Sequence, residues 1–186
     1  HCVTGVQTCA LPICKEHLTL ALSQLGYPLP AAGLPFVFQL GSELFRQLWH
    51  RLRPPLPNGT PVALRAALAL ERLSEIHFFT AEALDSVLCS FRALNLSQTL
   101  PPSDVQIRNL ATVGGTLGGA MNLHTTAQRD LERAEQMAVQ LRQPSAEAWV
   151  HLLDGLYRIG TGSWDLAIRR LLQAERTYVE LGALRR

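Results

Sequence analysis

One residue pattern recurs three times along the 186-residue chain. It consists of a small residue, an apolar residue four positions later and a second small residue three positions after that. The copies are Ala83-Val87-Ser90, Ala127-Leu131-Ala134 and Ala167-Leu171-Ala174, and their first residues are 44 and 40 positions apart. A period of about 20 to 50 residues is typical of stacked repeat arrays, in which one unit cannot bury its apolar face alone. The pattern therefore predicts an array, and indicates binding more clearly than catalysis.

Apolar residues recur at helical spacing through the whole chain, and no strand-length alternation of period two is present, so the fold class is predicted to be all-α. Helix boundaries follow from local signals. Thr60 followed by Pro61 predicts a helix start, Ser103 with Gln106 predicts a capping box, and Gly182 predicts a stop. The predicted helices cover 15–25, 35–52, 104–121 and 125–142, with others beginning near 60, 80, 144 and 163. The last helix is expected to bury one apolar set: Trp164, Ala167, Ile168, Leu171, Leu172, Tyr178 and Val179.

The third copy is similar to the tetratricopeptide pattern in its small and aromatic positions: Gly155, Gly162, Trp164, Ala167, Leu171 and Ala174. Gly115 and Asn122 occupy the matching places in the second copy, whereas the first copy has Glu71 in place of the glycine. The period also exceeds the usual ~34 residues. The resemblance implies a divergent, tetratricopeptide-like α-solenoid of antiparallel helix pairs.

Three segments are expected. Residues 3–13, VTGVQTCALPI, resemble the conceptual translation of a sequencing-adapter oligonucleotide, so 1–14 is interpreted as non-native. Residues 15–57 would hold a truncated repeat helix, an extra helix and a Pro-rich linker. Residues 58–186 would hold three tetratricopeptide-like helix pairs.

Longer phrases at 73–79, 90–96, 155–164 and 178–182 resemble the helical C-terminal region of large bacterial signalling proteins. In that family a nucleotide cyclase domain, often of the adenylate cyclase type, and a STAND-type AAA ATPase domain precede the helices. The resemblance implies a fragment that is not itself an enzyme and that takes part in signal transduction. A rival interpretation is the helical-repeat region of a large ATP-binding transcriptional regulator, and a third is a free-standing helical enzyme.

Composition narrows the partners. A net charge of +2 is too small to indicate nucleic acid. No apolar run is long enough to span a bilayer. The segment 34–49 is expected to be a helix packed on the edge of the array; the alternative is that, followed by two arginines, it lies on a membrane surface. Excluding the adapter-like segment leaves Cys89 as the one native cysteine, which argues against a disulfide framework and favours a cytoplasmic location.

The sequence contains no strong motif for a phosphate-binding, metal-binding or catalytic site. The glycine-rich stretch 114–119 lacks the lysine of a phosphate-binding loop, and its i, i+4 glycines favour close helix packing instead. The histidines outside the adapter-like segment have no second ligand at helical spacing. No catalytic residue, metal or cofactor is therefore expected.

The expected activity is binding of a protein, a peptide or the parent protein's own catalytic domains. Aligning the repeats on Glu71, Gly115 and Gly155 makes Arg65, Asn109 and Trp149 equivalent first-helix positions. The predicted partner groove consists of Arg65, Arg72, Asn109, Thr112, Thr116, Trp149 and Leu152. Its arginines, hydroxyls and aromatic ring suit an acidic, partly apolar peptide.

Overall fold

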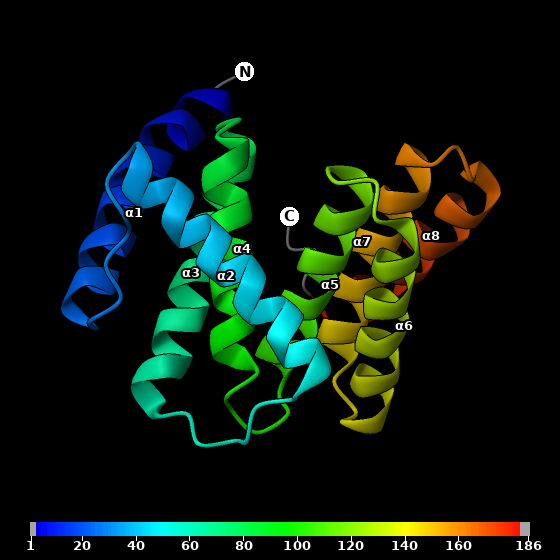
Figure 1. Cartoon of the computed structure of the whole chain (residues 1–186). Helices are drawn as coiled ribbons and strands as arrows, with labels where there is room; N and C mark the ends of the chain where they lie inside the picture. The colour runs from blue at the N-terminus through cyan, green and yellow to red at the C-terminus, as the bar shows by residue number, and fades with distance from the viewer. Residues whose placement is uncertain (1–2, 183–186) are drawn as a thin grey trace. The chain divides into compact units, whose positions relative to one another are not determined.

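A computed structural model describes residues 3–182 of the chain, and every regular element in that range is an α-helix. The eight helices are α1 (Val3–Gln24), α2 (Leu34–Leu52), α3 (Pro61–Phe79), α4 (Ala83–Ser97), α5 (Asp104–Gly119), α6 (His124–Gln140), α7 (Pro144–Gly160) and α8 (Trp164–Glu180). The all-α prediction is confirmed (Figure 1). The chain divides into two compact units, one ending at Pro101 and the other beginning at Pro102.

The first unit is built around the antiparallel pair α3 and α4. The helix α1 packs against α3, and α2 packs against α4. Its core is made of side chains that are almost fully buried: Leu22, Leu70, Leu73, Leu88, Phe91 and Leu94. The second unit contains two pairs, α5 with α6 and α7 with α8, and α7 also packs against both α5 and α6. This packing of neighbouring pairs is consistent with a helical solenoid.

Local signals place several helix ends as expected. The Thr60 hydroxyl accepts a hydrogen bond from the Ala63 amide at 3.3 Å, and Pro61 is the first residue of α3. Gly182 adopts φ of +65° just after α8, which suits a residue without a side chain.

Other expectations are wrong. The first helix begins at Val3 rather than Lys15 and continues through Pro12. The expected start followed from interpreting residues 1–14 as adapter-derived, and the origin of a segment does not determine whether its backbone is helical. Ser103 has the extended backbone of an N-cap, but its side chain makes no capping hydrogen bond, so the predicted capping box is absent. Residue types alone do not fix the orientation of a hydroxyl.

The predicted inner face of α8 is only partly correct. Ala167 and Ala174 are buried, but Trp164 is 60% exposed, and Ile168, Leu172 and Val179 are also exposed. The reason is that the backbone of α8 packs closely only against α7 among the described helices, with Arg170 reaching Glu135 on α6, so α8 buries one narrow line of small residues.

Candidate functional site

Matching close contacts within each helix pair define the true repeat register. A Cβ added to Gly155 would lie 2.7 Å from Leu171, and one added to Gly114 would lie 3.3 Å from Leu131. In the first pair Ser74 takes the same place, with its hydroxyl 2.6 Å from that of Ser90. The crossing positions are therefore Ser74, Gly114 and Gly155, not Glu71, Gly115 and Gly155.

Two misalignments explain the error. In the first copy Ala83 is the first residue of α4, whereas Ala127 and Ala167 stand three positions into α6 and α8. Ser86 is therefore their true equivalent, and the first copy shifts by three residues.

In the second copy the turn length differs by one residue. The Glu82 and Ser163 amides donate to carbonyls five residues back, whereas the Leu123 amide donates to the Leu117 carbonyl, six residues back. Each turn has one residue with positive φ: Ala81, Asn122 and Gly162. Measured from the crossing position, Asn122 stands one residue later than the other two. The turn between α5 and α6 thus contains one extra residue. Aligning α6 with α8 therefore shifts α5 by one position relative to α7.

The corrected register changes which residues are equivalent. Trp149 corresponds to Arg108 on α5 and to Leu68 on α3. Asn109 corresponds instead to the buried Val150 and is itself only 1% exposed, with its amide donating to the Val105 carbonyl at 3.0 Å. Asn109 is therefore a packing residue, and its assignment to a partner groove is corrected.

Besides Asn109, four of the predicted groove residues lie on the adjacent helices α5 and α7. The Trp149 indole donates a hydrogen bond to the Thr112 hydroxyl at 3.3 Å. The hydroxyls of Thr112 and Thr116 each donate to the carbonyl four residues back, at 2.9 Å. All four side chains, Thr112, Thr116, Trp149 and Leu152, are half-buried. The structure thus brings Trp149 and Thr112 into direct contact.

The two predicted groove arginines belong to α3 in the first unit. Arg65 and Arg72 are both exposed, and the Arg72 guanidinium pairs with Glu75 at 2.9 Å. They share a helix face with each other but are not part of the contact between α5 and α7.

A polar network that sequence reasoning missed joins the helices of the second unit. Glu135 on α6 bonds with His151 on α7 at 3.1 Å and with Arg170 on α8 at 2.7 Å. Arg170 also pairs with Asp154 at 2.8 Å, and Asp154 pairs with Arg158. The hydrogen bonds from His151 and Arg170 lower the pKa of Glu135 to about 2. Residues 16 and 35 positions apart meet here, so no local spacing signals the network.

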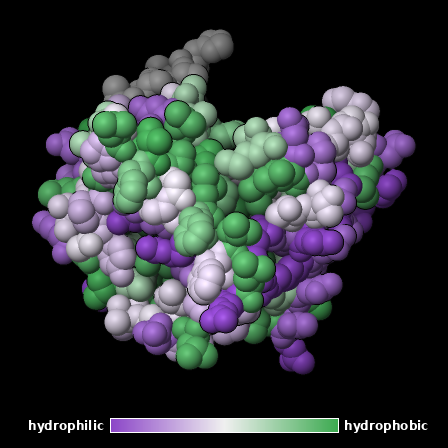
Figure 2. Space-filling model, in the orientation of Figure 1, coloured by the Kyte–Doolittle hydropathy of each residue, from purple (hydrophilic) through white to green (hydrophobic). Residues whose placement is uncertain are grey.

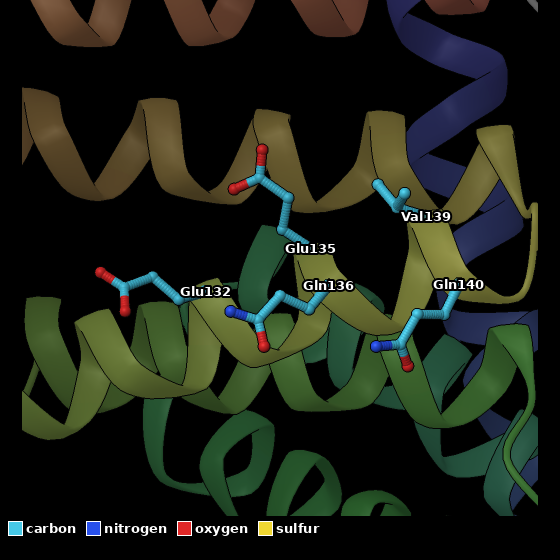
Figure 3. Close-up of a pocket in the computed structure, with 5 residues that line it drawn as sticks. All are labelled: Glu132, Glu135, Gln136, Val139 and Gln140. Carbon is cyan, nitrogen blue, oxygen red and sulfur yellow. The ribbon is translucent and has the colours of Figure 1, made fainter.

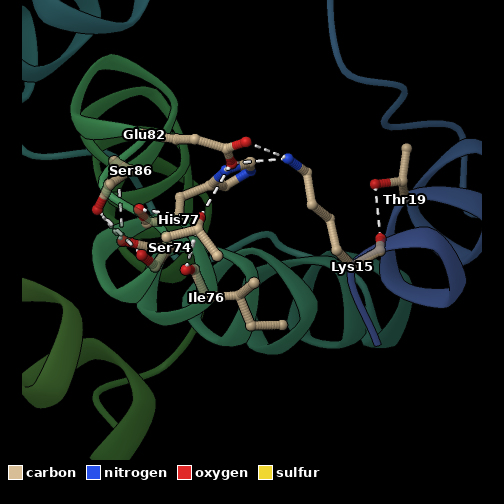
Figure 4. A network of polar contacts seen from close by, with 8 residues as sticks. Lys15, Thr19, Ser74, Ile76, His77, Glu82 and Ser86 are labelled. Carbon is tan, nitrogen blue, oxygen red and sulfur yellow. Dashed lines mark hydrogen bonds and ion pairs between the residues drawn. The ribbon is translucent and has the colours of Figure 1, made fainter. Parts of the chain in front are cut away.

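A second network fixes the turn between α3 and α4 (Figure 4). Lys15 on α1 donates to the Glu82 carboxylate at 2.6 Å, and the buried His77 bonds with the same carboxylate at 2.5 Å. The hydrogen bonds from Lys15 and His77 lower the pKa of Glu82 to about 2. Beside it, the Ser74 hydroxyl bonds with those of Ser86 and Ser90. The serines bond with one another at the helix crossing, which indicates a structural role.

The described surface offers little for a small ligand. One open depression, about 360 Å³, is lined by Glu132, Glu135, Gln136, Val139 and Gln140, which all project from α6 (Figure 3). A site built on one helix lacks the converging walls of a ligand pocket. Within residues 3–182 no three His, Cys, Asp or Glu side chains cluster as metal ligands would.

Comparison with known proteins adds no further assignment: no protein-family model, no curated protein and no solved structure matches this chain.

Proposed function

We propose that this chain is a non-catalytic helical-repeat segment that binds a protein or peptide across α5 and α7. The observation that carries the proposal is the contact between Trp149 and Thr112, which joins the first helices of two consecutive pairs. Trp149 is half-buried, so its ring is held in place yet remains accessible. Rigid, partly buried tryptophans are frequent anchors of protein interfaces.

The neighbouring side chains set the chemistry of the partner. Arg108 lies one turn before Thr112 on α5 and pairs with Asp104 at 2.7 Å, while Leu152 follows Trp149 on α7. An aromatic ring, an aliphatic side chain and a guanidinium suit an extended peptide that carries an apolar residue next to a carboxylate.

A phage-displayed library of 12-residue peptides, selected on the 186-residue chain, tests this proposal. We expect enrichment of sequences that pair acidic with apolar residues. Trp149→Ala should weaken the binding of a selected peptide at least tenfold. Trp164→Ala is the matched control, since Trp164 is an exposed tryptophan on α8, and it should leave binding unchanged. Selected peptides that bind the Trp149→Ala variant as well as the original chain would contradict the proposal.

The proposal extends to the parent protein. The phrases at 73–79, 90–96 and 155–164 support placement in a larger bacterial, cytoplasmic signal transducer with an ATPase or nucleotide cyclase-like domain. The genomic sequence around the segment tests this directly. A cyclase or STAND-type ATPase domain upstream supports it, whereas a helix-turn-helix domain downstream would favour the transcriptional regulator.

A further inference from the structure

The helix α2 packs against the first unit through its polar side. Glu43 is 1% exposed and Gln47 is 4% exposed. The Asn95 amide on α4 donates to the Glu43 carboxylate at 2.8 Å and to the Glu43 carbonyl at 2.9 Å. His50 bonds with Gln98 at 2.8 Å. These contacts fix the orientation of α2 on α4.

The opposite side of α2 is apolar and faces outward. Seven of its side chains are between 48% and 85% exposed: Leu34, Val37, Phe38, Phe45, Leu48, Trp49 and Leu52. We call these seven residues the α2 apolar face. Most of them recur at spacings of three and four, so they form one stripe along the helix, interrupted at Gly41 between Phe38 and Phe45. Figure 2 shows hydrophobic side chains along the path that α2 follows in Figure 1.

The exposed charged side chains of α2 and its C-cap are all arginines. Arg46, Arg51 and Arg53 are exposed, while the single carboxylate of α2, Glu43, is buried. The buried carboxylate is already compensated, since Arg46 lies 3.7 Å and Arg92 4.0 Å from it. The Arg53 guanidinium lies 5.5 Å from the centre of the Trp49 ring, so a positive charge lies directly beside an aromatic residue of the α2 apolar face.

We propose that α2 is an interfacial helix that docks the first unit onto an anionic lipid surface. A helix with aromatic and aliphatic residues on one side and arginines at its edge lies in the membrane interface with its apolar side among the acyl chains. No helix within the described residues is long and apolar enough to cross a bilayer. The attachment is therefore peripheral, with α2 parallel to the surface.

The charge of α2 argues against a second copy of the chain as the partner that covers the α2 apolar face. Antiparallel pairing of two α2 helices would bring together two faces that expose arginines and no carboxylate, and like charges destabilise such a contact. The α2 apolar face is also a ridge rather than a groove, because it is one side of a single helix. A fluid lipid surface covers a ridge without needing a complementary pocket, and anionic headgroups complement the net positive charge of α2 and its C-cap.

Flotation with lipid vesicles tests the proposal on the 186-residue chain. We expect binding to vesicles of phosphatidylcholine and phosphatidylserine, and much weaker binding to phosphatidylcholine alone. The double variant Phe38→Ser with Phe45→Ser should weaken binding at least tenfold, because each ring loses its place among the acyl chains. The double variant Arg51→Gln with Arg53→Gln should weaken it about fivefold per arginine, on anionic vesicles only.

The matched control is Phe78→Ser with Phe79→Ser, which removes two phenylalanines that are 69% and 75% exposed on α3. This control should bind vesicles as the original chain does. Thermal melts of all variants establish that each one folds. In a chain carrying Trp149→Phe and Trp164→Phe, brominated lipids should quench the remaining Trp49 fluorescence.

Three results would overturn the proposal. The first is a folded chain that does not float with anionic vesicles. The second is equal loss of binding in the Phe38/Phe45 and Phe78/Phe79 variants, which would reveal nonspecific adhesion of exposed aromatic rings. The third is a dimer in sedimentation that becomes a monomer in the Phe38/Phe45 variant, which would make a second copy the occupant.

Discussion

Replacing Gly118 with alanine tests the close packing of α5 against α7. A Cβ at Gly118 would lie 2.6 Å from the Tyr157 ring atom Cδ2, closer still to Cε2, and 2.9 Å from the Ala127 Cβ. The Tyr157 ring is 5% exposed, and its hydroxyl lies 3.0 Å from His124 Nδ1. The Tyr157 ring is held by the backbone of α7 at one end and by the hydrogen bond to His124 at the other, so it cannot move aside easily. The added methyl group therefore has to displace α6 or α7.

Two opposing effects set the magnitude. Alanine in place of glycine within a helix stabilises by about 0.5 to 1 kcal/mol, whereas forcing a methyl group into a packed contact costs about 1 to 3 kcal/mol. At Gly118 the steric cost should exceed the gain in helix propensity, so the alanine variant should be less stable. Gly115 on the same helix is the matched control, since a Cβ there meets no atom within 4 Å. Gly115→Ala should therefore be stabilising.

Urea unfolding followed by circular dichroism measures both variants. We expect Gly118→Ala to lower, and Gly115→Ala to raise, the free energy of unfolding, with a gap of about 1 to 3 kcal/mol between them. In a Tyr157→Ala background the cost of Gly118→Ala should shrink, because the ring it strikes is gone. Equal stabilities for the two alanine variants would refute the close approach of α5 to α7 at Gly118.

Four further outcomes are expected. As pH falls from about 4.5 towards 2, the chain should lose stability, because a carboxylate with a lowered pKa stabilises the fold only while ionised; Glu135→Gln should flatten this dependence in urea titrations. Iodoacetamide at pH 8 should alkylate Cys89 only in urea, since burial raises the pKa of its thiol to about 12. Trp164→Ala should cost less than about 1 kcal/mol in unfolding titrations, since the side chain is mostly exposed. Deleting residues 1–13 should lower the helical circular dichroism but not the melting temperature, because the buried Leu22 of α1 lies beyond the deletion.

The sequence predicted the helices well because their boundaries depend on neighbouring residues. Pro61 and Pro144 each open a helix as expected, and the helix predicted over 35–52 corresponds to α2 within one residue. The repeat register was less accessible. Turn length between α5 and α6 is a backbone property, and the extra residue there has no distinctive side chain.

The candidate site was predictable only in part for the same reason. Thr112, Thr116 and Trp149 were selected by aligning the repeats, and each is half-buried at the surface although the alignment of α5 is wrong by one residue. For Asn109 the same error matters, since one position around a helix turns a side chain by about 100° and moves it from the surface into the packing. Which residues of two repeats are equivalent therefore depends on the length of the turn, whereas which residues of one helix share a face depends only on their spacing in that helix.

The orientation of α2 shows a deeper limit. An amphipathic pattern divides a helix into two sides, and the usual assumption is that the apolar side faces inward. Glu43 reverses that assumption because its partner, Asn95, lies 52 residues away on α4 and satisfies the carboxylate inside the unit. A buried, compensated carboxylate leaves the apolar side free to face outward. Which side of such a helix is buried is thus decided by a polar partner distant in sequence.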